Sequence, residues 1–263
     1  MKYIKLYLTY AKCSLMGKLT YKANVIIGLA AFLFAEAFSL LTLYLIISAV
    51  PSIDGFSIYQ MGFLFGITNM AIGIDHLLSD RLWTVSYYEV KTGKMDHFFL
   101  RPLPVLFQVL ASEIQLEALG ELIVGIAMIS VCASKINVTI NFSGILLLVF
   151  GIICAAIIIT SFKIFVASLA FVFKRSGPLL QIVYNLSMYS KYPLPIFPKV
   201  IQYLLLFVIP LGLCLYVPFD NIFNPVYNPY LLILVIIAFT VLFATIALLI
   251  WKFCARRYES TGT

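Results

Sequence analysis

Residues 142–173 read "FSGILLLVFGIICAAIIITSFKIFVASLAFVF", and this stretch decides the class of the fold. It is almost continuously apolar and contains a single charged residue, Lys163. About 20 apolar residues in an α-helix cross the hydrocarbon core of a bilayer, where a helix satisfies its own backbone hydrogen bonds. We therefore predict a membrane-spanning helix over 142–173.

The rest of the chain has the same character. Of its 263 residues, 63% are hydrophobic and 11% are charged, whereas about 25% of residues are charged in soluble domains. Further apolar runs cover 24–50 (ended by 51–55), 56–78, a third span up to about Ala133, part of 178–217, and 230–251. We predict an all-α integral membrane protein with six transmembrane helices, formed by a single domain, 1–263, without a soluble catalytic domain.

The positive charges indicate the orientation of these spans. Cytoplasmic loops of membrane proteins are enriched in Lys and Arg. If the N-terminus is cytoplasmic, 14 of the 18 Lys and Arg residues fall on the cytoplasmic side, in 1–23, 79–103, 174–175 and 252–257. We expect both termini to be cytoplasmic, and we expect the net charge of +7 to reflect topology, with no nucleic acid as a partner.

The N-terminal segment, 1–23, has an amphipathic pattern. Tyr3, Leu6, Tyr7 and Tyr10 recur at helical spacing with lysines between them. Tyrosine rings and lysines suit a helix that lies among lipid headgroups. We predict an interfacial helix in contact with membrane lipids; the alternative is a flexible basic tail.

The stretch 178–217 allows two topologies, because prolines interrupt it at 193, 195, 198 and 210. In the first, 177–191 is a cytoplasmic amphipathic segment and 200–217 is the fifth span. In the second, 175–191 is a short fifth span, 192–198 is an outer turn, and 199–217 dips into the outer leaflet and returns. Non-helical backbone at membrane depth requires cover by protein. Hydropathy does not separate the two.

Ionisable residues within the spans are candidate functional groups, because each costs at least about 2.5–3.5 kcal/mol at mid-bilayer. Glu36 lies near the middle of the first span, and Lys163 lies in the inner half of the fourth. Glu113, Glu117 and Glu121 recur every four residues, which predicts a stripe on one helix face. The stripe faces a polar path or pairs with Lys163, or its first members lie in water. Because spans three and four are neighbours in sequence, Glu117 or Glu121 is a candidate partner of Lys163; a structural pair and a role in transport are both left open.

Metal binding is not indicated. Asp75 and His76 lie together near the inner end of the second span, but the only other histidine is His97 in the following segment. The five cysteines are scattered and lack metal-ligand spacing. We expect no metal site in this chain.

The segment 79–103, between spans two and three, is compact and charged. Gly93 permits a turn, Asp96 is placed to cap a short helix, and Pro102 disfavours helix at Arg101. We predict a short cytoplasmic helix attached rigidly to both neighbouring spans; the alternative is a solvated loop.

Four motifs in order carry a resemblance to a known family. "GKMDHFFLRPLP" (93–104) resembles the Gly-x-x-Asp-x-x-Leu-x-Arg-Pro-Leu signature of bacterial type-2, exporter-class ABC transporter permeases, with Phe99 in place of the first Leu. "LTYKAN" (19–24), "YSKYPLPIFPKVIQYLLLFVIPLGLCLYVP" (189–218) and "WKFCARRYESTGT" (251–263) resemble further motifs of the family. Together they extend over almost the whole chain.

The resemblance implies the number of spans, two protein partners and a role for the segment 79–103. Such permeases have six spans in a bacterial plasma membrane and pair with a second permease, often a paralogue in a heterodimer, with a homodimer as the alternative. A cytoplasmic ABC ATPase subunit docks on the coupling helix between spans two and three. Here that helix falls within 79–103, and the resemblance assigns ATPase coupling to Gly93, Asp96, Leu100, Arg101 and Pro102. It also favours the second topology, with 192–218 as an outer re-entrant segment.

The chain is not expected to be an enzyme. A phosphate-binding loop requires Gly-x-x-x-x-Gly-Lys-Ser/Thr, whereas Gly93-Lys94 is followed by Met95 and position 88 is Tyr. ATP and Mg²⁺ therefore belong to the partner ATPase, and we expect no cofactor in this chain.

These patterns support an ATP-driven exporter of amphipathic drugs, lipids, peptides or glycans. Glu36, Glu117, Glu121 and Lys163 are its candidates for the translocation path or for intramembrane pairing. An ion-gradient-driven secondary transporter is the alternative, although such folds contain duplicated halves and we detect no internal repeat. A membrane enzyme or scaffold protein is the third possibility.

Overall fold

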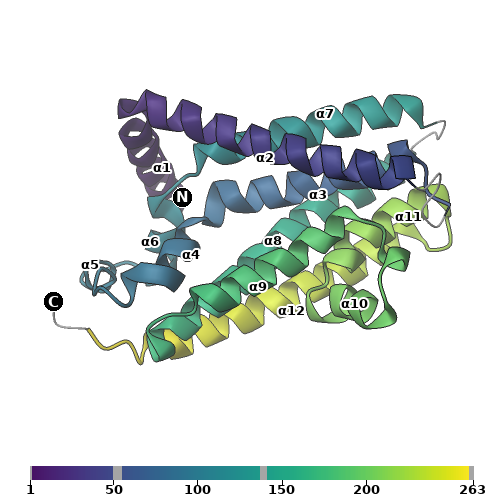
Figure 1. The fold of residues 1–263 in the computed structure, drawn as a ribbon. Coiled ribbons are helices and arrows are strands. Elements are labelled where there is room, and N and C mark those ends of the chain that lie inside the picture. The colour runs from purple at the N-terminus through teal and green to yellow at the C-terminus, as the bar shows by residue number, and fades with distance from the viewer. Residues whose placement is uncertain (1, 50–54, 137–140, 261–263) are drawn as a thin grey trace.

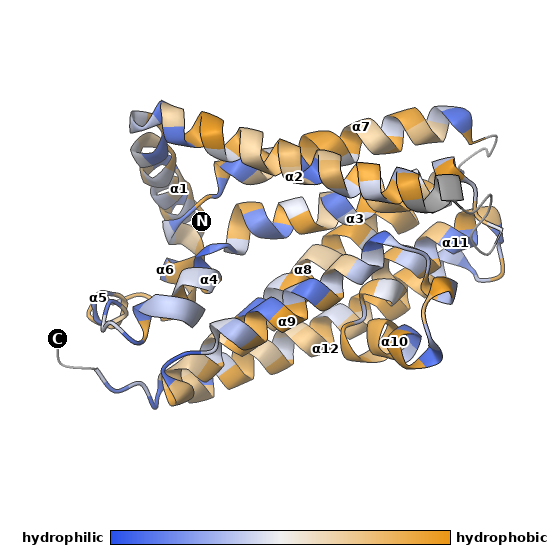
Figure 2. Cartoon of the chain, viewed as in Figure 1, coloured by the Kyte–Doolittle hydropathy of each residue, from blue (hydrophilic) through white to orange (hydrophobic). Residues whose placement is uncertain are grey.

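The computed structural model describes residues 2–49, 55–136 and 141–260, and within these ranges all regular secondary structure is helical. Long helices lie side by side in one elongated bundle (Figure 1). Apolar residues predominate on the long helices, with polar residues interspersed, as on α3 (Figure 2). The predicted all-α class is confirmed. The predicted end of the first span at 51–54 lies outside the described residues.

Five helices in the described residues are long and apolar enough to cross a membrane. They are α2 (Lys22–Ala49), α3 (Ile58–Ser79), α7 (Leu119–Lys135), α8 (Phe142–Phe173) and α12 (Pro229–Ala255). They correspond to the first, second, third, fourth and last of the predicted spans.

Other helical elements connect or flank these five. They are α1 (Lys2–Thr20), α4 (Arg81–Thr84), η1 (Val85–Glu89), α5 (Asp96–Phe99), α6 (Val105–Ser112), η2 (Leu116–Ala118), α9 (Gly177–Met188), η3 (Tyr189–Lys191), η4 (Leu194–Ile196), α10 (Lys199–Tyr203), η5 (Leu204–Val208), η6 (Gly212–Tyr216) and α11 (Val217–Phe223).

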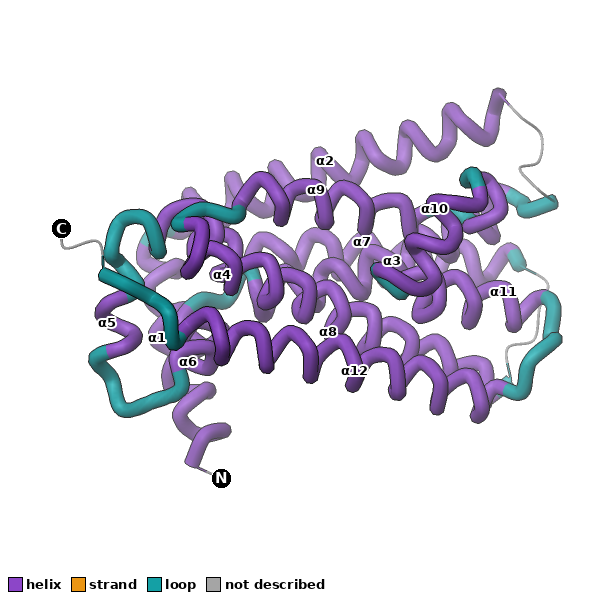
Figure 3. The backbone as a smooth tube through the Cα atoms, turned by 90° about the horizontal axis from the view of Figure 1, so that it is seen from below, coloured by secondary structure: helices purple, strands orange, loops and turns teal. Residues whose placement is uncertain are grey.

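The predicted N-terminal helix is present as α1. It lies crosswise at one end of the bundle, and both ends of the chain are at that same end (Figures 1 and 3). Ile4 and Leu8 are exposed on α1 whereas Ala11 is buried. A continuous helix replaces the flexible tail that the sequence also allowed; its position at the membrane surface stays a prediction.

Glycines bring α3 and α7 into close contact. A Cβ added to Gly66 would lie 3.0 Å from the carbonyl oxygen of Gly125, and a Cβ added to Gly125 would lie 3.0 Å from that of Gly66. A Cβ added to Gly62, one turn earlier on α3, would lie 2.6 Å from the side-chain sulfur of Cys132. Small residues at such spacing let membrane helices approach until their backbones pack. This packing places α3 inside the bundle.

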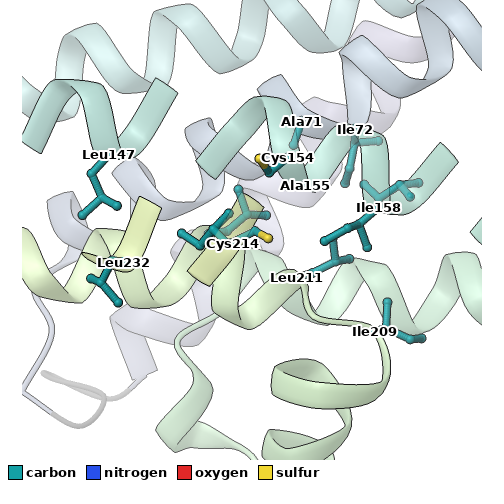
Figure 4. Close-up of a cluster of buried hydrophobic side chains, with 13 residues drawn as sticks. Ala71, Ile72, Leu147, Cys154, Ala155, Ile158, Ile209, Leu211, Cys214 and Leu232 are labelled. Carbon is teal, nitrogen blue, oxygen red and sulfur yellow. The ribbon is translucent and has the colours of Figure 1, made fainter. Parts of the chain in front are cut away.

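Burial separates α3 from α2. Within its most apolar window, 78% of α3 is buried, against 6% of α2. α3 also packs on α8, and α8 packs on α12. Figure 4 shows part of this core, in which Ala71 and Ile72 of α3 lie near Cys154 and Ile158 of α8 and Cys214 of η6. The bundle is therefore centred on α3 and α8, and α2 is its most exposed long helix.

The proline-rich region folds back beside α8. α9 runs alongside α8 (Figures 1 and 3), which favours the second predicted topology. Two arms follow, Lys199–Val208 and Gly212–Phe223, with a bend of 85° between them. Gly151 of α8 allows this approach, since a Cβ there would collide with the carbonyl oxygen of Cys214. This bent pair is either a broken span or a re-entrant loop.

Candidate functional site

Lys163 forms a buried ion pair with α3. Its Nζ lies 2.6 Å from Oδ2 of Asp75 and 3.2 Å from Oδ1 of Asp80. The other carboxylate oxygen of Asp75 accepts hydrogen bonds of 2.6 Å from the hydroxyls of Ser79 and Thr160. The Lys163 side chain is 2% exposed, so the pair is desolvated and each charge depends on its partner.

The predicted pairing of Lys163 with Glu117 or Glu121 is therefore wrong. It assumed that helices adjacent in sequence are adjacent in space. α3 packs against both α7 and α8, so that it supplies the acidic partner of Lys163. The sequence signal was Asp75 itself, an acidic residue in an apolar span.

Glu36 also has a buried basic partner. Its Oε1 lies 3.2 Å from Nζ of Lys191, and its Oε2 accepts a hydrogen bond of 2.7 Å from Nδ2 of Asn69. The Lys191 Nζ lies 4.7 Å from the centroid of the Phe65 ring, within the range of a cation–π interaction. These contacts connect α2, α3 and η3. The sequence did not identify Lys191 as this partner; the available signal was a lysine within an apolar stretch.

The glutamate stripe does not lie on one helix. α6 ends at Ser112, residue 113 is extended, and α7 begins only at Leu119. The backbone N–H groups of this break find partners elsewhere: that of Ile114 donates to Oγ of Ser14, and that of Gln115 donates to the carbonyl of Leu77. Contacts with α1 and α3 thus replace helical hydrogen bonds.

Each of these glutamates instead has its own partners. Glu121 lies 2.9 Å from Nδ1 of His76. Glu117 and Glu113 lie 3.4 Å and 3.6 Å from Nζ of Lys18 on α1. Glu113 also lies 3.4 Å from Nη1 of Arg81, and Gln115 accepts a hydrogen bond of 2.6 Å from Lys18. The stripe therefore joins α1 and α3 to the start of α7.

A cavity of about 430 Å³ lies beside the Asp75–Lys163 pair. Most of its lining is apolar, and it includes Tyr7 of α1, Ala156 and Thr160 of α8, and Leu248 of α12. Among the described residues, no group of three or more His, Cys, Asp or Glu side chains is arranged to hold a metal ion.

The segment between α3 and α6 forms the predicted short helix, α5. Gly93 has φ of +69°, as the predicted turn requires, and helix ends at Phe99, shortly before Arg101 and Pro102. Asp96 does not cap this helix through its side chain. Instead, its carboxylate accepts hydrogen bonds from Ser260 and Tyr258, which hold the pKa of Asp96 below its usual range.

Buried groups hold this segment against the bundle. Met95 and Phe98 are buried, and Nε2 of Gln108 on α6 donates to the carbonyls of Phe98 at 2.8 Å and Leu103 at 2.9 Å. Burial raises the pKa of Glu89, and its contact with Arg81 opposes that rise. The outer side of the segment is free of such cover: Leu100 is 84% exposed.

A family model described as "ABC-2 family transporter protein" matches residues 20–262. The chain belongs to this family. No curated protein and no solved structure matches it. The match covers nearly all of the described helices, so the resemblance inferred from four motifs is confirmed. As an ABC-2 family protein, the chain is a multi-pass membrane permease, a transport component that is not itself catalytic.

Two of the four motifs of this ABC-2 protein meet in space. Asp96, from the first motif, contacts Tyr258 and Ser260, from the last. Arg101 donates a hydrogen bond of 3.2 Å to Oη of Tyr10 on α1. Gly93, Leu100 and Pro102 lie in the same segment. The predicted coupling residues are thus gathered at one end of the bundle, and the predicted path residues Glu36, Glu117, Glu121 and Lys163 are in separate pairs.

Proposed function

We propose that this chain is the permease subunit of an ATP-driven exporter, moved by a cytoplasmic ABC ATPase that docks on residues 93–102. The observation that carries the proposal is the combination of an exposed outer side and a rigidly held inner side in this segment. A docking helix must present a free surface to its partner and must transmit displacement to the spans behind it. α5 and its flanks meet both requirements.

The exposed side has the composition of a docking surface. Leu100 and Phe99 are 84% and 37% exposed, and Tyr88 nearby is 65% exposed. Lys91, Lys94 and Arg101 are exposed around them. Aromatic and apolar residues with a charged surround are typical of protein interfaces. Such a surface fits a groove with an apolar floor and acidic walls.

The inner side is held by independent contacts. Gln108 fixes the carbonyls on either side of Leu100, and Met95 and Phe98 fill the space beneath α5. Closure of ATPase subunits on nucleotide is a domain-scale motion. A segment held in this way transmits that motion to α3 and α6 instead of deforming.

A second permease, homologous or identical, would complete the path. α2 supports this part of the proposal, because it is the least covered long helix and exposes Phe34, Phe38 and Leu41 along one side. α9 exposes the polar side chains of Gln181 and Asn185, which suit a hydrated path. The buried pairs of Lys163 and Lys191 are neutralised within this chain, so we assign them to structure and not to cargo binding.

The proposed membrane placement follows the positive charges. The end of the bundle with α1, α5 and the C-terminal tail is cytoplasmic, in a bacterial plasma membrane. α1 lies among the inner headgroups, and its exposed Ile4 and Leu8 contact lipid. The bend between η5 and η6 is then at the outer side, and 192–218 is a re-entrant segment covered by α8.

The test is co-purification of the tagged chain from its native membrane in mild detergent. We expect an ABC ATPase and a second permease to accompany the wild type. Leu100→Glu should release the ATPase but not the second permease. Val226→Glu is the matched control, because Val226 is 74% exposed at the other end of the bundle.

The outcomes separate two failures. If the ATPase remains bound to Leu100→Glu, the docking site is wrong. If no ATPase accompanies the wild type, the proposed function is wrong, and an ion-gradient-driven carrier becomes the better hypothesis.

A further inference from the structure

The chain after α12 returns to residues 93–102, the proposed docking segment, which we call the coupling segment. Oη of Tyr258 donates a hydrogen bond of 2.7 Å to Oδ1 of Asp96, and Oγ of Ser260 donates one of 2.6 Å to Oδ2. Both oxygens of one carboxylate are therefore bound by the tail. Hydrogen bonds to an ionised acceptor are roughly twice as strong as neutral ones.

Aromatic rings add a second attachment at the same place. The Tyr258 ring stacks on Phe99 of α5 with centroids 4.8 Å apart and an angle of 6° between the planes. Its edge meets Phe171 of α8 at 5.7 Å, and Phe171 in turn meets Trp251 of α12 at 5.1 Å. Aromatic pairs in these geometries attract beyond their burial of surface. Tyr258 thus lies between α5 on one side and α8 on the other.

A third contact fixes the tail to the end of α8. Lys174 ends this helix with φ of +62°, and its Nζ donates a hydrogen bond of 3.3 Å to the carbonyl of Glu259. Few non-glycine residues adopt this left-handed conformation. It directs the chain away from the axis of α8, beside the tail.

We propose that residues 256–260 are a strap that fixes the coupling segment to α8 and α12. By sequence, α5 is joined to α3 and, through α6, to α7. Met95 and Phe98 already share a buried cluster with residues of α8 and α12, and Phe99 meets Phe171 of α8. The strap adds hydrogen bonds, a stacked ring and a direct chain connection to α12, so displacement of α5 is passed more firmly to α8 and α12. This role in coupling rests on the proposed docking of an ATPase, whereas the attachment itself does not.

The attachment is tested on the permease alone, by hydrogen exchange of residues 93–100 in lipid nanodiscs. Tyr258→Ala removes the ring and the hydrogen bond, and we expect exchange to rise about tenfold or more, the scale of one hydrogen bond to a charged group. Tyr258→Phe keeps the stacked ring and should give an intermediate rise. Arg256→Ala, at an exposed position of the same tail, is the control and should leave exchange unchanged. Unchanged exchange in Tyr258→Ala overturns the strap.

The transmission is tested on the complex with its ATPase, by distances between spin labels. One pair joins positions 231 on α12 and 58 on α3; the other joins positions 58 and 131, on α3 and α7. We expect ATP with vanadate to change both distances in the wild type. Tyr258→Ala should reduce the change at α12 and keep that at α7, with the ATPase still bound.

The two experiments fail in different ways. A full change at α12 in Tyr258→Ala overturns transmission through the strap. If no ATPase binds the wild type, the proposed function and the transmission are both overturned, and the exchange result alone decides the attachment.

Discussion

Replacing Lys163 by Met removes the cation from a buried cluster and leaves its acidic partners in place. Asp75 would retain the hydroxyl donors of Ser79 and Thr160 but would have no counter-charge within the bundle. The side chain of Asp75 is fully covered, whereas that of Asp80 is 24% exposed and reaches water. Losing the Lys163 cation therefore leaves mainly Asp75 as an unpaired buried charge.

The magnitude follows from the burial of the pair. Breaking a buried ion pair from one side costs about 3–5 kcal/mol, because an uncompensated charge remains. Asp75→Asn should cost less, since Lys163 keeps Asp80 at 3.2 Å and the Asn oxygen still accepts from both hydroxyls. The double variant removes both charges and should recover most of the stability, with a coupling free energy of about 0.5–3 kcal/mol.

The assay is the free energy of unfolding in mixed micelles, from a titration with sodium dodecyl sulfate. Tryptophan fluorescence follows the site directly, because Nζ of Lys163 lies 6.0 Å from the centroid of the Trp83 ring. Lys199→Met is the matched control. Lys199 is exposed, so its replacement should change the free energy of unfolding by no more than about 0.5 kcal/mol.

Two results would refute the reasoning. The first is a Lys163→Met protein as stable as the wild type, which means that Asp75 is neutral or hydrated. The second is a double variant that loses the sum of the two single losses, which means that the groups do not interact. A stable single variant that has lost ATP-driven transport would instead return Lys163 to the translocation path.

Three further predictions concern the Glu36–Lys191 pair, the close approach at Gly151 and the carboxylate of Asp96. Lys191→Met leaves Glu36 buried with Asn69 as its remaining partner, so the free energy of unfolding should fall by about 3–5 kcal/mol in the same titration; an unchanged value contradicts the pair. Gly151→Ala should lower the thermal midpoint of the purified protein, because its Cβ meets the backbone at Cys214, whereas Gly17→Ala should not, since a Cβ at Gly17 meets nothing within 4 Å. Hydrogen bonds from Ser260 and Tyr258 lower the pKa of Asp96, so the strap contact is present above the ordinary pKa and is lost as pH falls through the lowered one. In the double variant Ser260→Ala/Tyr258→Phe, a carboxylate NMR titration should show this pKa rising toward its ordinary value, and no rise would contradict the contact.

The long helices could be predicted from the sequence because they depend on local properties. A run of apolar residues long enough to cross a bilayer forms a helix whatever its neighbours are. The turn at Gly93 and the end of α5 before Pro102 likewise depend on the backbone chemistry of one or two residues. These elements can therefore be predicted without knowing which helices contact one another.

Which charged side chains pair with one another inside the bundle could not be predicted in this way. The spacing of Glu113, Glu117 and Glu121 implied one helix face only if the helix was continuous, and contacts with Ser14 and Leu77 interrupt it. The partner of Lys163 depends on which helix lies beside α8, and that depends on the close approach of α3 and α7 at Gly66 and Gly125. Such approaches are properties of pairs of helices.

α3 contributes one residue to each of three buried contacts with other long helices. Asn69 of α3 is hydrogen-bonded to Glu36 of α2, His76 lies beside Glu121 of α7, and Asp75 is paired with Lys163 of α8. α3 leads directly into α4 and toward residues 93–102, the proposed docking segment, so a displacement of that segment acts first on the helix that holds these contacts. Separating a buried charge from its partner costs several kcal/mol, so we expect α7 and α8 to shift only slightly relative to α3. α2 is the least covered of the five long helices, and we expect the bundle to open along it, which requires Glu36 to leave both Lys191 and Asn69.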